Sequence, residues 1–291
     1  MLSGVLSDTF YPNRIHPKMI LPFFHIDAFA DQPFTGNPAV VYPLSKWLPD
    51  RVLQAIAMEH NLSETAFFVP SESAYELRWF TPATEVDLCG HATLASAYVL
   101  FQELGVQHHE LSFFTRSGTL RVGRVPSGYC MDFPSVRMQP YGGSTDFLQQ
   151  ALGLSKPPIS IWEADDVVVC IQNYEELCSL EPNMTQLENI QTRGIIVTSR
   201  SAIEGVDFAS RFFGPRVGVN EDPVTGSAHT KLIPFWSEQL GKTHMRAFQA
   251  SKRGGYLDVE YAGDRVMITG KARRFSRGET SLSDEFISLH T

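Results

Sequence analysis

The stretch Phe80-Thr-Pro-Ala-Thr-Glu-Val-Asp-Leu-Cys-Gly-His-Ala-Thr-Leu-Ala-Ser96 decides the fold, because the chain repeats its plan in the second half. The second copy is Phe213-Gly-Pro-Arg-Val-Gly-Val-Asn-Glu-Asp-Pro-Val-Thr-Gly-Ser-Ala-His229. Each copy runs from the end of a strand through Phe-x-Pro and an acidic loop to a helix that begins at a glycine. A repeat of half the chain is too long for a solenoid, so it predicts two similar α+β domains that face each other.

The two predicted helix starts, Gly90-His91 and Gly226-Ser227, carry unpaired N–H groups and a partial positive charge. Each could be an ordinary helix N-terminus. Their duplication favours a shared role, because two helix starts directed at one cleft would hold an anionic substrate, whereas capping does not require a repeat. Since sites commonly form between domains, we expect a catalytic site there that uses neither metal nor cofactor.

Composition narrows the class of partner. The chain has 291 residues, of which 43% are hydrophobic, enough for two domains with real cores. A net charge of -8 argues against nucleic acid or an anionic membrane as the main partner. No apolar run approaches the ~20 residues that a membrane span needs. The four cysteines form no C-x-x-C pair, which favours a reducing compartment, so we expect a cytoplasmic protein.

Hydrophobic periodicity predicts similar sets of elements in the two halves. Pro49 stands in the first turn of a predicted helix that Asn61 caps, and the helix from His91 ends at Gly105. The predicted strands of the first half are 23–30, 39–44, 65–69, 75–80, 111–115, 119–125 and 129–133. The second half has predicted helices at 144–153 and 226–241, helical turns within 174–188, and strands at 167–171, 195–198, 208–213, 245–249, 257–261 and 266–269.

Several catalytic motifs are absent from the sequence. It contains no G-x-G-x-x-G, H-E-x-x-H or G-x-S-x-G. Gly241-Lys-Thr243 lacks the first glycine of a P-loop, because Trp236 holds that position. His108-His-Glu110 comes just before a predicted strand and is more typical of a solvated turn than of a metal site. Nucleotide, zinc and α/β-hydrolase chemistry are therefore disfavoured.

Carboxylates beside the helix starts are the remaining candidates for chemistry. Glu64 lies in Leu62-Ser-Glu-Thr-Ala66, and Asp222 lies in Glu221-Asp-Pro-Val-Thr-Gly-Ser227. Taken alone, a Glu at a helix-to-strand corner is more often a cap or a solvated charge, and Asp-Pro is a turn signal. A helix N-terminus would lower the pKa of Glu64 and burial would raise it, and the sequence leaves both open.

Four further side chains near these motifs carry weaker signals. Cys89 precedes a helix start, where the pKa of a thiol falls, so it is a candidate nucleophile or acid, with a buried small residue as the alternative. Glu85, Asp87 and Glu221 are interpreted as loop charges.

Taken together, the motifs resemble the phenazine-biosynthesis PhzF family. The resemblance rests on Phe34-Thr-Gly-Asn-Pro38, Leu62-Ser-Glu-Thr-Ala-Phe67, Phe80-Thr-Pro82, Cys89-Gly-His-Ala-Thr93 and Glu221-Asp-Pro-Val-Thr-Gly-Ser-Ala-His229, and it covers the chain from about Leu21. It is strongest to the branch that includes the MAWD-binding protein. The resemblance implies the diaminopimelate epimerase-like fold: two pseudo-symmetric halves, each with a mixed or antiparallel sheet wrapped round a central helix, and an active-site cleft between them.

The resemblance also implies roles for individual residues. Glu64 would be the general acid/base that moves a proton between substrate carbons, with Asp222 as its polar partner and His91 as a third catalytic side chain. In diaminopimelate epimerases two cysteines carry protons; here Cys89 stands at one of those positions, but Asp222 stands at the other, so a two-cysteine racemase is disfavoured. Substrate binding would fall to Asn37, Gly90, Gly226 and Ser227.

The expected organisation combines the repeat with the resemblance. Residues 1–20 form an N-terminal extension and 21–137 a first domain completed by a C-terminal strand at 275–291, while 138–274 form the second domain. Residues 1–18 lack the basic start and the apolar region of a signal peptide. A homodimer is possible, because the family often forms dimers.

We therefore expect a cofactor-independent, epimerase/racemase-like isomerase that catalyses a proton shift or an epimerisation on a small carboxylate-bearing molecule. A general acid/base contributes roughly 10²–10⁴-fold to the rate, so Glu64 would also need N–H donors that stabilise the carbanion-like charge, each worth roughly 10²–10³-fold. One alternative is an interaction protein of the MAWD-binding type. Another is a hydrolase that uses Ser227, although no activating base is evident at a suitable spacing.

Overall fold

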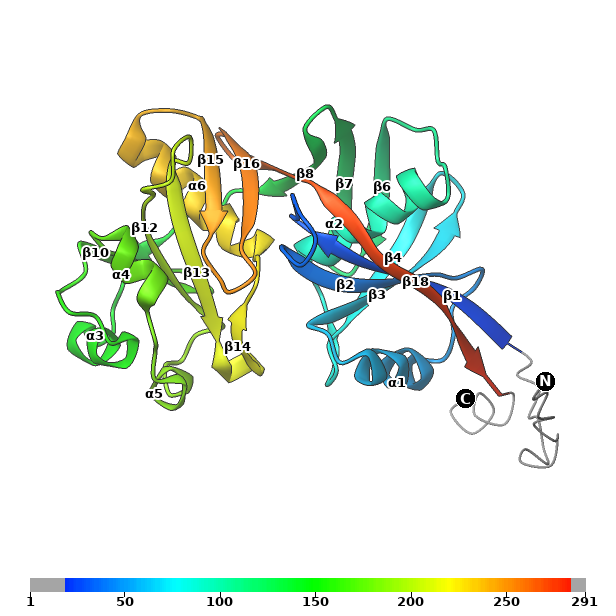
Figure 1. Ribbon diagram of the computed structural model, residues 1–291, viewed down its shortest axis with the longest axis horizontal. Helices are drawn as coiled ribbons and strands as arrows, with labels where there is room; N and C mark the ends of the chain where they lie inside the picture. The colour runs from blue at the N-terminus through cyan, green and yellow to red at the C-terminus, as the bar shows by residue number, and fades with distance from the viewer. Residues whose placement is uncertain (1–18, 284–291) are drawn as a thin grey trace, which may run out of the picture.

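The computed structural model describes residues 19–283. It is an α+β fold of two lobes that lie side by side, as the sequence predicts, and each lobe has a sheet curved round one central helix (Figure 1). The central helices are α2 (Gly90–Tyr98) and α6 (Gly226–Leu240). The predicted N-terminal extension falls almost wholly outside the described residues.

The first lobe is organised round α2. Every residue from Gly90 to Ala97 is buried, because the sheet encloses a helix made largely of small residues. A π-helical turn, η2 (Val99–Glu103), extends α2, so the predicted helix is longer than its regular part. The other elements are β1 (Met19–Ala28), β2 (Asn37–Pro43), α1 (Asp50–His60), β3 (Glu64–Ser71), β4 (Ala74–Phe80), β5 (Glu85–Val86), β6 (Glu110–Thr115), β7 (Gly118–Val125) and β8 (Gly128–Pro134).

The second lobe encloses α6 in the same way. Gly241 ends α6 in the left-handed conformation that favours glycine, with φ 67°. The other elements are β9 (Gln139–Pro140), α3 (Thr145–Leu152), β10 (Ser160–Glu163), β11 (Val167–Cys170), α4 (Tyr174–Ser179), α5 (Met184–Glu188), β12 (Ile195–Arg200), β13 (Phe208–Gly214), η3 (Pro215–Val217), β14 (Val219–Asp222), β15 (His244–Gln249), β16 (Gly255–Ala262) and β17 (Arg265–Gly270).

The pairing of the strands repeats between the lobes. In the first lobe, β2 and β3 are parallel, β3 and β4 antiparallel, β4 and β5 antiparallel, and β4 and β6 parallel. In the second lobe, β11 and β12 are parallel, β12 and β13 antiparallel, β13 and β14 antiparallel, and β13 and β15 parallel. The internal repeat in the sequence is therefore also a repeat of topology.

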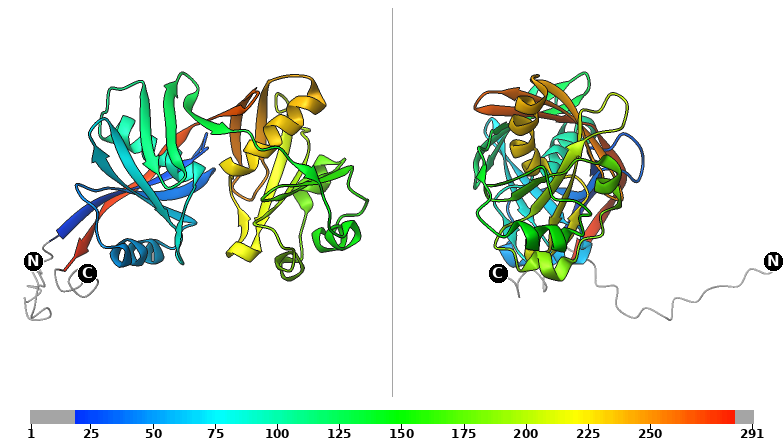
Figure 2. Two further views of the ribbon diagram at one scale, coloured as in Figure 1. Left: turned by 180° about the vertical axis from the view of Figure 1, so that it is seen from behind. Right: turned by 90° about the vertical axis from the view of Figure 1, so that its left-hand side faces the viewer.

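Two strand pairings join the lobes. β8 pairs with β17 from Gly270↔Tyr129 to Arg265↔Pro134. The long strand β18 (Ala272–Leu282) then leaves the second lobe and pairs with β1, as the two views in Figure 2 also show. The strand predicted for 275–291 begins earlier than expected, because Ala272 already pairs with Ala28, and residues 284–291 lie outside the described part of the chain.

Some of the local predictions from the sequence agree with the structure and others do not. Asn61 caps α1 with φ 49° and ψ 37°, as predicted, whereas Pro49 is the residue before α1 and not part of its first turn. The interpretation of Glu85 and Glu221 as loop charges is wrong. Each lies in a short strand and forms an ion pair, with Arg78 and Arg211 respectively, because neighbouring strands bring these side chains together. Among residues 19–283, no helix combines the length and the apolar character that crossing a bilayer requires.

Candidate active site

The N-terminal ends of α2 and α6 meet where the two lobes join. A Cβ placed on Gly90 would lie 3.5 Å from the Cα of Gly226, and the reciprocal distance is also 3.5 Å. The absence of side chains at both positions lets the two backbones approach closely. Both helix starts therefore direct unpaired N–H groups toward one junction, where an anion would be stabilised.

Glu64, the first residue of β3, lies beside the start of α2. Its side chain is 18% exposed, and Oε2 lies 3.3 Å from Nε2 of His91. Oε2 is itself buried and has no hydrogen-bond partner in the described structure. A buried carboxylate oxygen without a partner is costly, so it points to a group kept for a ligand or for chemistry.

The two candidate carboxyl groups both have raised pKa values. Burial raises the pKa of Glu64 to about 7, and the negative charge of Asp222 adds to the effect, against hydrogen bonds from Ser63 and Cys89 that lower it. Burial also raises the pKa of Asp222 to about 6, although Thr225, Asn37 and Arg193 oppose that shift. Burial therefore outweighs the helix N-terminus, and the two groups titrate as an interacting pair, in two steps near neutral pH.

His91 is a neutral side chain in the first turn of α2. Burial lowers its pKa to about 3. Nδ2 of Asn37 lies 3.2 Å from His91 Nδ1; both of its protons go to closer acceptors and the nitrogen cannot accept, so the proton of the neutral ring is assigned to Nε2. Nε2 faces Glu64 Oε2 and the Ser63 hydroxyl, which is 3.4 Å away. His91 thus offers an N–H donor at this side of the junction.

Asn37 links the two lobes behind these groups. Its side-chain nitrogen donates to Asp222 Oδ1 at 2.8 Å and to the carbonyl of Val224 at 2.9 Å. Asn37 is fully buried, and the protons of its amide are directed to protein acceptors. We expected Asn37 to bind substrate. Its contacts are those of a residue that orients Asp222 and His91.

Asp222 is fixed at the start of α6. Its Oδ2 accepts a short hydrogen bond from the Thr225 hydroxyl, and its carbonyl accepts from Gln249 Nε2 at 2.8 Å. Gln249 Oε1 also accepts from the backbone N–H of Thr225 at 2.8 Å. Sequence reasoning missed Gln249, which no motif marks, and Ser63, which its position beside Glu64 could have indicated.

The predicted lowering of the Cys89 pKa is wrong. Cys89 does precede α2, with Sγ 3.5 Å from His91 Nδ1. However, burial raises its pKa well above the ordinary range, and the charge of Glu64 raises it further. Cys89 is therefore a protonated thiol rather than a nucleophilic thiolate, because desolvation exceeds the effect of the helix start.

Glu64, Cys89 and His91 are also the one group of three potential metal ligands in residues 19–283, with ligand atoms within 4.8 Å of one another. A metal bound here would have to displace the proton of the Cys89 thiol. His108 and His109 are exposed and belong to no such group.

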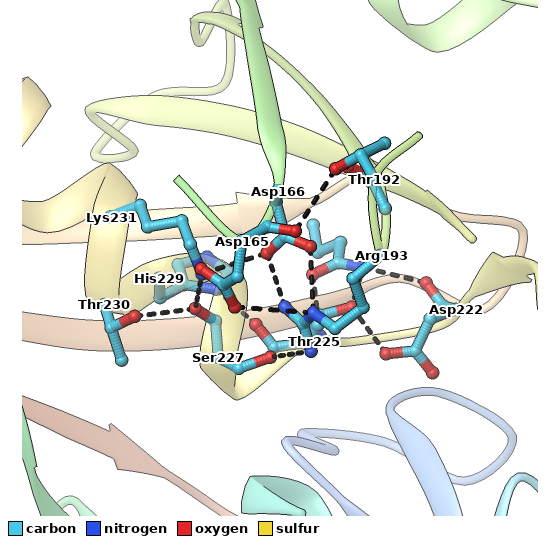
Figure 3. A network of polar contacts seen from close by, with 12 residues as sticks. Asp165, Asp166, Thr192, Arg193, Asp222, Thr225, Ser227, His229, Thr230 and Lys231 are labelled. Carbon is cyan, nitrogen blue, oxygen red and sulfur yellow. Dashed lines mark hydrogen bonds and ion pairs between the residues drawn. The ribbon is translucent and has the colours of Figure 1, made fainter. Parts of the chain in front are cut away.

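Ser227 lies in the first turn of α6 and contacts a residue that the sequence did not single out. Its hydroxyl oxygen accepts a hydrogen bond from Arg193 Nη1 at 3.0 Å. Arg193 belongs to a cluster of charged side chains, with Asp165, Asp166 and Lys231, that gathers round Ser227 (Figure 3). No motif marks Arg193, because its partners are distant in the sequence.

A large surface cavity lies elsewhere. It has a volume of about 650 Å³ and is lined by residues that include Tyr98, Arg124 and Lys271, and by none of the candidate site residues. The candidate site is therefore identified by its contacts and pKa shifts and not by cavity size.

Comparison with known proteins gives a consistent result. The family model described as phenazine biosynthesis-like protein (PhzC-PhzF) matches residues 26–278. An uncharacterized isomerase of Pseudomonas aeruginosa is 49% identical over 264 residues, which cover 91% of this chain and 100% of the relative. The human phenazine biosynthesis-like domain-containing protein is 41% identical over 278 residues, covering 87% of this chain and 96% of the relative.

Solved structures extend the comparison. A PhzF family protein of Enterococcus faecalis superposes with a TM-score of 0.87 at 43% identity and covers 91% of this chain and 100% of that chain. A hydroxyproline epimerase of Agrobacterium vitis, at 10% identity, has a TM-score of 0.60 and covers 92% of this chain and 94% of that chain. At that identity the second match indicates a shared fold only.

Proposed function

This chain belongs to the phenazine biosynthesis-like (PhzC-PhzF) family, and we propose that it is a cofactor-independent isomerase that moves a proton between carbon atoms of a small carboxylate-bearing molecule. Relatives named as isomerases support the general class. The observation that carries the specific reaction is Glu64 Oε2, a buried carboxylate oxygen without a hydrogen-bond partner, on a group with a pKa of about 7. A general acid/base with a pKa near the working pH can both take and return a proton.

The proposed reaction has two proton transfers. The Glu64 carboxylate takes a proton from a substrate C–H, and the electron pair of that bond moves into conjugation with the substrate carboxylate. The protonated Glu64 then returns the proton to another position of the same conjugated system, so the product is an isomer and Glu64 is again a carboxylate. Only the position of one hydrogen and of the double bonds changes.

The remaining groups of the site stabilise the negative charge that develops. The helix starts at Gly90 and Gly226, which approach each other closely, would supply backbone N–H donors, and the Nε2 proton of the neutral His91 would add a donor on the side of Glu64. Ser227 supplies a hydroxyl on the opposite side. Asn37 would act by positioning Asp222 and His91, because its amide protons are directed to protein groups.

Solvent-deuterium incorporation tests the proposal. Wild-type protein is incubated in deuterium oxide with a panel of small unsaturated carboxylic acids, and exchange at carbon is measured by proton NMR. We expect exchange with at least one acid and a loss of roughly 10²–10⁴-fold in Glu64→Gln. Glu72→Gln is the matched control, because Glu72 is exposed in a turn. Absence of both exchange and isomerisation with every acid, or equal rates in Glu64→Gln, would reject the proposal.

The same samples test the alternatives. Ser227 has a cation as its hydrogen-bond partner, where a hydrolase would need a general base, so we expect Ser227→Ala to weaken binding without abolishing exchange. Hydrolysis that is lost only in Ser227→Ala would favour the hydrolase. Binding of a protein partner that is unaffected by either substitution, without any turnover, would favour the interaction protein.

A further inference from the structure

The registers of the two lobes identify the counterpart of each site residue. Phe80 and Phe213 occupy the same position in the sequence repeat, and they pair with Thr65 and Ile195 respectively. The parallel pairings of β2 with β3 and of β11 with β12 give the same correspondence, because Thr65 pairs with Val40 and Ile195 pairs with Val167. The position of Glu64 is therefore Gly194 in the second lobe.

The second lobe has no room for a second proton carrier at this position. A Cβ at Gly194 would lie 2.2 Å from Cζ of Phe212, so any side chain would displace that ring. The residue before it, Arg193, corresponds to Ser63. Both counterparts contact the first turn of the central helix: Ser63 Oγ lies 3.4 Å from His91 Nε2, and Arg193 Nη1 lies 3.0 Å from Ser227 Oγ.

Charged residues hold Arg193 in this place. Asp166, which is fully buried, accepts from Arg193 Nε at 2.9 Å and forms a second, short contact with Nη2. Lys231, only 1% exposed, lies 2.9 Å from Asp166 and 2.8 Å from Asp165, and also donates to the Ser227 carbonyl at 3.3 Å. By register, Asp166 and Lys231 correspond to Ala39 and Ala95, so only the second lobe contains this cluster.

The cluster determines how Ser227 can act. Because the Arg193 guanidinium can only donate, the Ser227 oxygen accepts, and its own proton is left to point at a ligand. A hydroxyl that accepts from a cation is polarised and becomes a stronger donor to an anionic oxygen. The side chain of Arg193 is 37% exposed, and it also places a positive charge within reach of Asp222.

We propose that Arg193, held by Asp166, is the positioning residue that makes the second lobe select an anionic group of the substrate through Ser227. This rests on the proposed function in assigning the anion to a carboxylate substrate. The two lobes thus have different roles. The first provides the proton carrier, Glu64, and the second provides Arg193, a fixed cation that orients the hydroxyl of Ser227.

Paired probes of equal shape test the proposal without turnover. Binding of benzoate and of benzamide, which lacks the charge, is measured by isothermal titration calorimetry. We expect wild-type protein to prefer benzoate, and Arg193→Met to lose about 10- to 100-fold in affinity for benzoate but less than about threefold for benzamide. Asp166→Asn should lose part of the preference, because Arg193 is no longer held. Arg265→Met, which removes an ion pair with Asp132 on β8 and β17, is the control.

Rescue separates positioning from a structural role. Adding guanidinium ion to Arg193→Ala at concentrations below its unfolding range should restore part of the benzoate preference, and Arg193→Lys should retain part of it. The proposal is overturned if wild-type protein does not prefer benzoate, if folded Arg193→Met keeps the preference, or if both probes weaken equally. Anion selection that persists in a protein without carbon exchange would reject the isomerase and leave this proposal intact.

Discussion

Oε2 of Glu64 lies 3.3 Å from Nε2 of His91, and yet this oxygen has no hydrogen-bond partner. The neighbour is a neutral imidazole, because burial lowers the pKa of His91 to about 3. No cation therefore compensates the charge of Glu64 from this side, and the carboxyl group retains its proton to a higher pH than usual.

Glu64→Gln should stabilise the protein at alkaline pH. The pKa of Glu64 is about 7 in the folded protein, against an ordinary value of 4.5, so the folded state binds more protons between these values and its free energy of unfolding falls as the pH rises through them. Glutamine resembles the protonated carboxyl and removes this loss. Urea unfolding should show Glu64→Gln more stable than wild type by about 1–3 kcal/mol at pH 8 and by less at pH 5. An advantage that is equal at both pH values would contradict the assignment.

Asp222→Asn should lower the pKa of Glu64. The charge of Asp222 is the second cause of the raised pKa after burial, so its removal leaves the Glu64 carboxylate easier to form. A carbon NMR titration of the Glu64 carboxyl group measures the shift directly and needs no substrate. Asp132→Asn should leave the titration unchanged, because the charge of Asp132 is not among the causes of the Glu64 shift. A pKa that stays constant or rises in Asp222→Asn would show that the two carboxyl groups do not interact.

Lys231→Met should destabilise the protein strongly. The substitution leaves Asp165 and Asp166 with Arg193 as their cation, and a buried ion pair that loses one partner costs about 3–5 kcal/mol. Urea unfolding gives the value. Lys242→Met, which removes an exposed pair with Asp207, should cost less than about 1 kcal/mol. Equal effects of the two substitutions would mean that the buried network contributes no more than a surface pair.

Gly194→Ala should destabilise the protein by about 1–3 kcal/mol, because the new methyl group overlaps the ring of Phe212. In the double variant Gly194→Ala/Phe212→Leu, the smaller side chain at position 212 makes room for the methyl group and should recover part of the lost stability. A double-mutant cycle of unfolding free energies measures this recovery. Gly123→Ala is the control, because its Cβ would lie 4.0 Å from the His109 carbonyl oxygen, an ordinary van der Waals distance. Gly105→Ala is less suitable, because the positive φ of Gly105 would add backbone strain. A cycle without coupling would contradict the steric account.

The sequence predicted the architecture well for a specific reason. The Phe-x-Pro and Gly-led motifs recur because both lobes need a tight connection from a strand into a buried helix, and such a connection depends on neighbouring residues. The Asn61 cap is local in the same sense. Contacts between residues that are distant in the sequence were missed. These are the hydrogen bond from the backbone N–H of Thr225 to Gln249 and the ion pair of Arg193 with Asp166.

The pKa of Cys89 was predicted wrongly for a related reason. The helix start, which lowers the pKa of a thiol, is visible in the sequence, whereas full burial beside Glu64 is a property of the packed lobes. Burial also decides the pKa values of Glu64 and Asp222. Sequence motifs thus located the groups of the site but not their protonation.

The unequal use of equivalent positions has a stereochemical consequence. A racemase that inverts a carbon needs proton carriers on opposite faces of a planar intermediate, and the position related to Glu64 by the repeat is a glycine with no space for one. Because the proposed reaction gives both proton transfers to Glu64 and none to Asp222, a substrate between α2 and α6 would lose and regain hydrogen on a single face. The expected transformation is a suprafacial migration that yields one enantiomer, and not a mixture of mirror images.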